Sequence, residues 1–220
     1  MAQRHEEKYL IDYRQYATLK ARAMKVLTPD THGTSGSYVI TSLYYDDPMD
    51  TAVLEKQDGL ARHTKFRVRT YDGSDGIIKL EKKVKQGILT QKQAAPITRE
   101  QISCLGWNTD CFDGEGRELA IQMQATCLRP AITVRYKRDA FFFRGADLRL
   151  TFDTDLEILP PVAESLFDVN AMGIPVLDKN TVIMEIKYGS YLPEFVRSLT
   201  AVSATHLSVS KYALCRERME

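Results

Sequence analysis

Charged and apolar side chains alternate in six short segments of this chain, and this alternation constrains its fold more than any other feature. In the clearest case, Lys65, Arg67 and Arg69 occupy every second position, and Phe66 and Val68 lie between them. Successive side chains of a β-strand point to opposite faces, so each segment is predicted to be a strand with one charged face and one apolar face. The other charged sets are Arg4, Glu6 and Lys8; Lys79, Glu81, Lys83 and Lys85; Arg135 and Lys137; Arg149, Asp153, Asp155 and Glu157; and Glu185 and Lys187.

Strands outnumber helices in the predicted order, and hairpin turns join most of them. The spacer 72–76, Asp-Gly-Ser-Asp-Gly, is a strong hairpin signal. The predicted strands are Arg4–Ile11, Tyr38–Tyr45, Thr64–Tyr71, Ile77–Val84, Ile88–Gln93, Ile132–Phe143, Leu148–Ile158 and Thr181–Tyr188. Helices are predicted at Tyr13–Leu27 and Asp50–Lys56, over Ile97–Leu128 with a break around Gly106 to Gly116, and at Leu192–Leu199 and Val209–Met219. The fold class is therefore mainly β (α+β), with an antiparallel sheet large enough to curl or close. All 220 residues are predicted to form a single domain.

The charged faces allow two interpretations. A sheet with one solvated face and one core face would explain each strand taken alone. If the sheet closes with the charged faces inward, it forms a tunnel, and the amphipathic segments 13–27, 115–128 and 192–219 cover the outside. We favour the tunnel because the charged sets are dense, contain both signs and are rich in arginine, whose donor fork suits phosphate oxygens. Its carboxylates would hold Mg²⁺ or Mn²⁺.

Overall composition excludes several functions. The net charge is +1, so no global field draws the protein to nucleic acid or to an anionic membrane. No run approaches the roughly 20 apolar residues of a membrane helix, and the first residues lack the apolar core of a signal peptide. The four cysteines, Cys104, Cys111, Cys127 and Cys215, lack zinc spacing and are expected to be buried thiols in a reducing compartment. We therefore expect a cytoplasmic protein.

An ordered set of motifs resembles one protein family. The motifs are Arg-x-Glu-x-Lys-Tyr at 4–9, Ser-Leu-Tyr-Tyr-Asp at 42–46, Lys-x-Arg-x-Arg-x-Tyr at 65–71, Glu-x-Lys at 81–83, Tyr-x-Arg at 136–138, Glu-x-Lys-Tyr at 185–188 and Ser-Lys-Tyr at 210–212. Together they resemble the VTC domain, the catalytic part of the vacuolar transporter chaperone polyphosphate polymerase. That family belongs to the triphosphate tunnel metalloenzymes, which include the CYTH phosphatases. The resemblance extends from about Arg4 to Tyr212.

The resemblance implies an eight-stranded antiparallel closed β-barrel tunnel, covered by peripheral helices. It implies transfer of the γ-phosphate of ATP onto a growing inorganic polyphosphate chain, with Mn²⁺ or Mg²⁺ as cofactor. The family's basic residues correspond to Lys8, Arg67, Arg69, Lys83, Arg135, Arg149 and Lys211, and its metal-binding glutamate to Glu185. CYTH relatives begin with Glu-x-Glu-x-Lys, whereas this chain has Arg4, which argues against the phosphatase branch. Any membrane association is expected to be left to a separate protein.

These observations assign an expected role to each site residue. Arg67, Arg69, Arg135, Arg149 and Lys83 are expected around the phosphate bond that breaks; Lys8, Lys65, Lys79, Lys211 and Arg138 are expected to bind the rest of the substrate. Lys79, Lys85 or Lys92 could replace or assist Lys83, and Arg138 competes with Arg135 from the opposite face of its strand. Glu185 is the expected metal ligand, with Glu6, Glu81, Asp153 or Asp155 as helpers.

Simpler alternatives remain at this point. Arg67 and Arg69 could pair with Glu81 across the sheet, and the acidic residues could form salt bridges with neighbouring lysines. At the level of function, the alternatives are a tunnel phosphohydrolase of tripolyphosphate or nucleoside triphosphates, and a catalytically silent module that binds polyphosphate or nucleotide.

Overall fold

The computed structural model describes residues 5–30, 36–57, 60, 62–87, 89–208 and 210–219. Arg4 and Ile88, which the sequence places in strands, lie outside the described residues. The strands are β1 (His5–Asp12), β2 (Thr28–Pro29), β3 (Ser37–Asp46), β4 (Arg62–Tyr71), β5 (Ser74–Gln86), β6 (Leu89–Pro96), β7 (Arg129–Phe143), β8 (Leu148–Leu159), β9 (Ile174–Pro175), β10 (Thr181–Tyr188) and β11 (Thr205–His206). The α-helices are α1 (Tyr13–Val26), α2 (Thr51–Gln57), α3 (Gly114–Ala125), α4 (Glu194–Thr200) and α5 (Lys211–Glu217), and the 3₁₀ helices are η1 (Glu100–Cys104), η2 (Thr109–Cys111), η3 (Arg144–Ala146) and η4 (Ala163–Leu166).

The strands pair in the order β11-β1-β10-β8-β7-β3-β4-β5-β6, with β2 added to β7 and β9 to β8. The pairs β1–β10, β10–β8, β3–β4, β4–β5 and β5–β6 are all antiparallel. The prediction of a mainly antiparallel β fold with a few helices is confirmed. Because β11 and β6 stand at the two ends of the order, hydrogen bonds among the described residues do not close the sheet, and the predicted closed barrel is not confirmed.

The chain divides into two compact units. Unit 1 comprises Met1–Val39, Tyr136–Leu156 and Leu177–Val209, and unit 2 comprises Ile40–Arg135, Glu157–Val176 and Ser210–Glu220. Strands β3, β7 and β8 contribute residues to both units.

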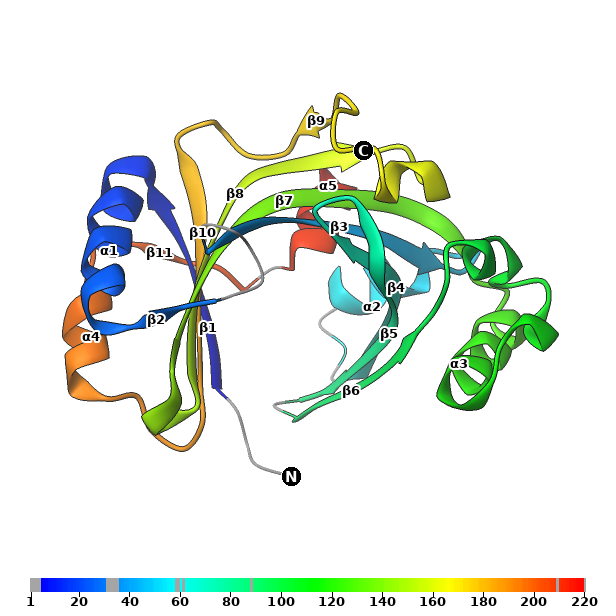
Figure 1. Ribbon diagram of the computed structural model, residues 1–220, viewed down its shortest axis with the longest axis horizontal. Helices are drawn as coiled ribbons and strands as arrows, with labels where there is room; N and C mark the ends of the chain where they lie inside the picture. The colour runs from blue at the N-terminus through cyan, green and yellow to red at the C-terminus, as the bar shows by residue number, and fades with distance from the viewer. Residues whose placement is uncertain are drawn as a thin grey trace. The chain divides into compact units, whose positions relative to one another are not determined.

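Unit 1 packs α1 and α4 against one face of β1, β10 and β8, and the two helices lie side by side (Figure 1). Leu19, Leu150 and Phe152 are fully buried in the core between them. Helix α1 begins where the sequence predicts, because Asp12 and Gln15 form a reciprocal capping box at its first turn. Since the apolar sets of β8 and β10 face the helices, their charged sets occupy the other face.

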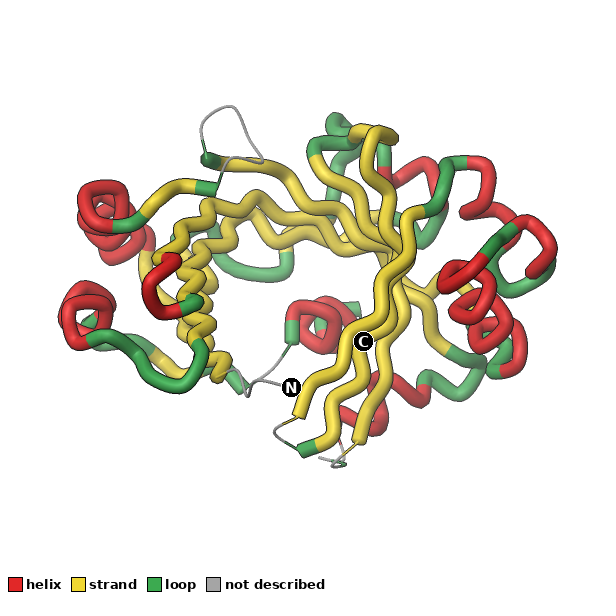
Figure 2. Tube along the Cα trace, turned by 60° about the horizontal axis from the view of Figure 1, so that its bottom comes forward, coloured by secondary structure: helices red, strands yellow, loops and turns green. Residues whose placement is uncertain are grey.

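Unit 2 likewise packs a helix against paired strands: β3, β4, β5 and β6 pair in that order, and α3 contacts β5 and β6. Figure 2 shows the strands of the protein in yellow and its helices in red. Its core contains Phe66, Val68 and Leu80 on the strands and Leu119 and Met123 on α3. Phe66 and Val68 alternate with the charged set of β4, so the predicted alternation of the two faces is confirmed for this strand.

The β4–β5 hairpin turns at Asp72 and Gly73, which both have positive φ (51° and 64°). Two left-handed residues match the twist of a two-residue hairpin, which explains the Asp-Gly sequence. A β-carbon on Gly73 would lie 2.6 Å from Val169 Cγ1, so the turn also needs glycine for the close approach of the 160–176 segment.

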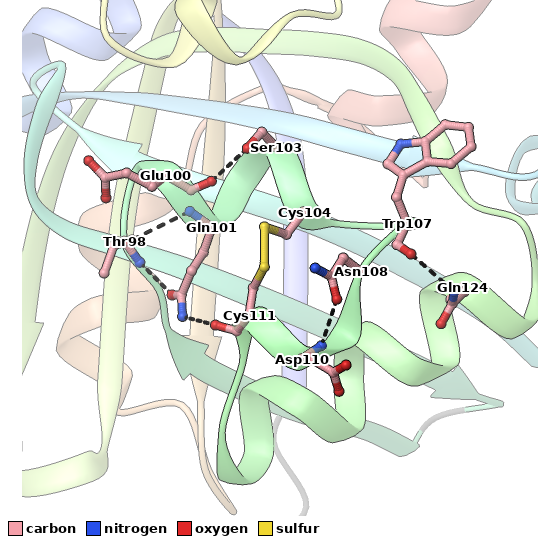
Figure 3. The surroundings of a disulfide bond; sticks show 10 residues. All are labelled: Thr98, Glu100, Gln101, Ser103, Cys104, Trp107, Asn108, Asp110, Cys111 and Gln124. Atoms are coloured by element: carbon pink, nitrogen blue, oxygen red, sulfur yellow. Dashed lines mark hydrogen bonds between the residues drawn. A yellow bond between two sulfur atoms is a disulfide. The ribbon is translucent and has the colours of Figure 1, made fainter.

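The region between β6 and β7 is helical with an interruption, as the sequence predicts, but the first part is not an α-helix. Only Gly114–Ala125 is α-helical, and the preceding part forms η1 and η2. Cys104 and Cys111 lie at the ends of these short helices and form a disulfide, with Gln101 Nε2 donating to the Cys111 carbonyl oxygen (Figure 3). The prediction of buried thiols is therefore wrong for this pair, and the argument for a reducing compartment does not hold for it. Cys215 is a buried thiol, and Cys127 is exposed.

Within the described part of the chain, none of the helices combines the length and apolar character required to span a bilayer.

Candidate functional site

The charged face of unit 2 is built from three strands in register. Directly opposite residues of an antiparallel pair place their side chains on the same face. The register therefore produces three rows across β4, β5 and β6. These rows are Lys65, Lys83 and Lys92; Arg67, Glu81 and Ala94; and Arg69, Lys79 and Pro96.

The first row places three lysines directly opposite one another. Like charges in this position destabilise a sheet, because their ammonium groups repel over a short distance. Polar partners partly compensate this repulsion: Lys65 donates to Ser210 Oγ (2.9 Å) and Lys92 donates to Glu81 Oε1 (2.5 Å). A lysine row of this kind is the arrangement expected of a surface that binds a polyanion.

Glu81 is the acidic centre of this face, and its side chain is only 2% exposed. Arg67 binds it through Nε (2.7 Å) and a terminal nitrogen (2.6 Å), and also donates to the Tyr44 hydroxyl (3.0 Å). The alternative that Arg67 pairs with Glu81 is thus observed. Glu81 is the one carboxylate in the three rows, and the other charged residues of the rows are lysines and arginines. These rows therefore carry a net positive charge.

The cations of this face control the ionisation of Glu81. Burial alone would raise the pKa of its carboxyl, but Arg67, Arg69 and Lys92 outweigh burial and lower that pKa to about 2. Because the folded-state pKa lies below the unfolded value, this group stabilises the fold above about pH 5, and the contribution disappears as the pH falls toward 2.

We expect Glu81→Gln to lower the free energy of unfolding by about 3 kcal/mol at pH 7, corresponding to the shift of the Glu81 pKa. The difference between wild type and variant should shrink as the pH falls from 5 toward 2. Urea unfolding at several pH values would measure it. Parallel stability curves for the two proteins would contradict the prediction.

Arg69 and helix α5 complete the unit 2 site. Arg69 Nε donates to Ser42 Oγ (3.0 Å), and a terminal nitrogen lies 4.0 Å from Glu81, so the protein satisfies this guanidinium less fully than that of Arg67. Ser210 caps α5 and places Lys211 in the first turn of the helix. Tyr212 packs against the ring of Tyr44 (4.8 Å) and donates to Asp46 (2.6 Å), which fixes α5 beside the charged face.

Unit 1 carries a second charged face, with balanced signs. Its register gives the row Lys8, Glu185 and Thr151 across β1, β10 and β8, and beside it the row Glu6, Lys187 and Arg149. Lys187 Nζ lies 2.5 Å from Glu185 and 3.9 Å from Glu6, and Lys8 pairs with Glu6.

Arg149 is positioned by residues that the sequence did not single out. One of its terminal nitrogens donates to Asp30 (3.2 Å) and to the Tyr38 hydroxyl (2.9 Å). Asp30 follows β2, and Tyr38 is the second residue of β3. Neither belongs to a motif, so the sequence offered no signal for their contact with Arg149. Ser42 and Tyr44, the partners of Arg69 and Arg67, lie in the Ser-Leu-Tyr-Tyr-Asp motif at 42–46, but the sequence did not indicate their pairing with these arginines.

The two competing arginines of β7 have different surroundings. Arg138 is buried in unit 1 and forms a bidentate pair with Asp153 (2.6 and 2.8 Å). Burial alone would lower the Arg138 pKa, but the charges of Asp153, Tyr136 and Glu185 raise it. Arg138 thus interacts electrostatically with Glu185, which lies on the charged face of unit 1.

Arg135 belongs to unit 2 and binds Glu157 (2.7 Å) together with backbone carbonyl oxygens of the 160–176 segment, including that of Ala171 (2.5 Å). Each of the two guanidinium groups is therefore paired with a carboxylate, Arg135 with Glu157 and Arg138 with Asp153. Asp155 has a positive φ (53°), which interrupts the regular alternation of side chains along β8. The prediction that Asp153 and Glu157 lie on the same face of the strand therefore fails.

The residues of unit 1 can hold a divalent metal ion only with help from a substrate. Among the described residues, no group of three His, Cys, Asp or Glu side chains is arranged to hold a metal ion. Glu185 and Glu6 share the ammonium group of Lys187, so a cation already lies between these two carboxylates. Mg²⁺ is commonly bound by one or two carboxylates plus substrate phosphates, and these two side chains fit that pattern. Glu81 and Asp153 are instead engaged by arginines.

Comparison with known proteins identifies the family. The model of the VTC domain matches residues 3–219, whereas no curated protein matches the chain. A solved structure from Bacillus halodurans, proposed to be an adenylate cyclase, is similar at a TM-score of 0.54 and 12% identity, covering 92% of this chain and 94% of that one. The protein PH1819 of Pyrococcus horikoshii is similar at a TM-score of 0.51 and 11% identity, covering 97% and 99%. At such identities the two structures support the fold alone. The match to the family model spans nearly all of the chain, which therefore belongs to the VTC domain family.

Proposed function

We propose that this protein is an ATP-dependent polyphosphate polymerase that acts as a single domain. It transfers the γ-phosphate of ATP to the end of a growing inorganic polyphosphate chain. The closed eight-stranded tunnel in which the family is expected to perform this reaction is part of the proposal and rests on family membership. A cytoplasmic location also belongs to the proposal.

The lysine row of unit 2, with Arg67 and Arg69 beside it, carries the proposal. Lys65, Lys83 and Lys92 lie directly opposite one another, so their like charges repel, and a bound anion would reduce this repulsion. A polyphosphate chain carries repeated negative charge and would relieve this repulsion along the row. Family membership supports the same substrate class.

The reaction needs no dedicated base. An oxygen of the terminal phosphate of the chain is already anionic, and it attacks the γ-phosphorus of ATP. A new P–O bond forms, the bond between the γ-phosphorus and the β–γ bridging oxygen breaks, and ADP leaves with that oxygen. Arg67 and Arg69 neutralise the transferring phosphate, while the lysine row orients the chain, so charge compensation and positioning provide the catalysis.

Glu185 and Glu6 are the residues we propose for holding Mn²⁺ or Mg²⁺ with the substrate phosphates. The bound ion would supply charge neutralisation on phosphate oxygens. Lys8, Lys187 and Arg149 surround these carboxylates and would bind further phosphate oxygens.

Purified protein incubated with ATP and Mn²⁺ should produce a ladder of polyphosphate on a stained gel, with a matching yield of ADP. Glu185→Gln should abolish the ladder, and Glu194→Gln, which changes an exposed glutamate on α4, is the matched control. Free phosphate without polymer would replace the proposal with a phosphohydrolase. Intact ATP in the presence of measurable binding would replace it with a silent binding module.

A further inference from the structure

Thr151 has a buried hydroxyl group with no hydrogen-bond partner among the described residues. The residue is 2% exposed and lies in the middle of β8 in unit 1. A buried hydroxyl without a partner costs stability, because it loses its hydrogen bonds to water and gains none in return. Such a group in a functional region requires an explanation.

The neighbours of Thr151 are the charged residues of the unit 1 face. Glu185 is directly opposite it on β10, and Lys8 is opposite Glu185 on β1. Arg149 lies two residues away on the same face of β8, and its Nε is likewise buried without a hydrogen-bond partner among the described residues. Two adjacent groups on one face therefore both have an unused N–H or O–H donor.

We infer that the Thr151 hydroxyl donates a hydrogen bond to a phosphate oxygen of the bound substrate, beside Arg149. This inference rests on the proposed function and adds to it a binding residue that carries no charge. A phosphate oxygen accepts from a hydroxyl and a guanidinium at once, and these are the two unused donors here.

The charges around Thr151 are compatible with this role. Lys187 sits at the same face with a side chain that is 38% exposed, and its flexible stem lets the ammonium group move away from Glu185 when phosphate and metal ion bind. A neutral donor adds a hydrogen bond without further positive charge beside Arg149 and Lys8.

The test compares two substitutions at Thr151 by calorimetric titration with sodium tripolyphosphate, in the presence and absence of Mn²⁺. Thr151→Val keeps the shape and removes the hydroxyl, so we expect roughly tenfold weaker binding. Its melting temperature should be equal to or higher than that of the wild type, because the unsatisfied hydroxyl is gone. Thr151→Ser retains the donor and should bind within about twofold of the wild type.

Thr133→Val is the matched control. Its hydroxyl is also buried without a hydrogen-bond partner among the described residues, but it lies two residues from Arg135, on the face that binds Glu157. This variant should bind tripolyphosphate like the wild type. Unchanged binding in Thr151→Val, or an equal loss in Thr151→Ser, would overturn the inference while leaving the proposed function intact. No binding by the wild type would overturn both.

Discussion

Replacing Arg69 by glutamine is expected to lower kcat/KM for polyphosphate synthesis by about 10²- to 10³-fold, the effect of removing one preorganised donor from a phosphoryl-transfer site. Arg67 donates hydrogen bonds to Glu81 and Tyr44, whereas Arg69 makes one hydrogen bond among the described residues, to the neutral Ser42. Arg69 can therefore direct more of its charge to a substrate. Initial rates of ADP release and polymer yield would measure the loss.

Two further variants separate charge from geometry. Arg69→Lys keeps the positive charge but loses the planar fork, so it should recover only part of the activity. Arg117→Gln on α3 is the matched control, because Arg117 is exposed and pairs with the exposed Asp110. Full activity in Arg69→Gln, with Glu185→Gln inactive, would show that the unit 2 face does not take part in the reaction.

Replacing Arg138 by methionine is expected to lower the free energy of unfolding by about 3–5 kcal/mol, because it leaves a buried carboxylate without its partner. The Asp153 side chain is 0% exposed and receives both hydrogen bonds of the pair from Arg138. Urea unfolding at pH 7 would measure the change. The double variant Arg138→Met with Asp153→Leu should recover most of the loss, since it removes both buried charges.

The exposed pair between Arg117 and Asp110 is the control for this experiment. Asp110→Ala should change stability by less than about 0.5 kcal/mol, because solvent screens an exposed pair. A loss of under about 1 kcal/mol in Arg138→Met would show that the pair contributes little to the fold. If the double variant is stable but binds no tripolyphosphate, Arg138 has a role in the site beyond stability.

Most strands and their two faces follow from the sequence. Alternation in 64–71 predicts both the core side of β4, with Phe66 and Val68 in the core, and its charged side. Helical spacing predicts the start of α1 at Tyr13, whereas the helix predicted from Val209 begins at Lys211. These features are local, since they depend on the period of a strand or of a helix.

Other features depended on how distant segments meet. The disulfide between Cys104 and Cys111 was missed because its spacing has no motif, and two 3₁₀ helices bring the residues together. The alternation of side chains along a strand predicted that Arg135 and Arg138 lie on opposite faces. Only the structure shows that Arg135 pairs with Glu157 and Arg138 with Asp153. The positive φ of Asp155, which interrupts the alternation of β8, likewise has no signature in the sequence.

The sequence by itself determined the strands, their charged faces and the resemblance to the VTC domain, because alternation and motif order are properties of the chain. Only the tertiary structure decided which charges face one another. Strand register aligned Lys65, Lys83 and Lys92 in one row and placed Thr151 opposite Glu185. Register depends on packing between segments far apart in the sequence, and a shift of one residue would move each side chain to the opposite face.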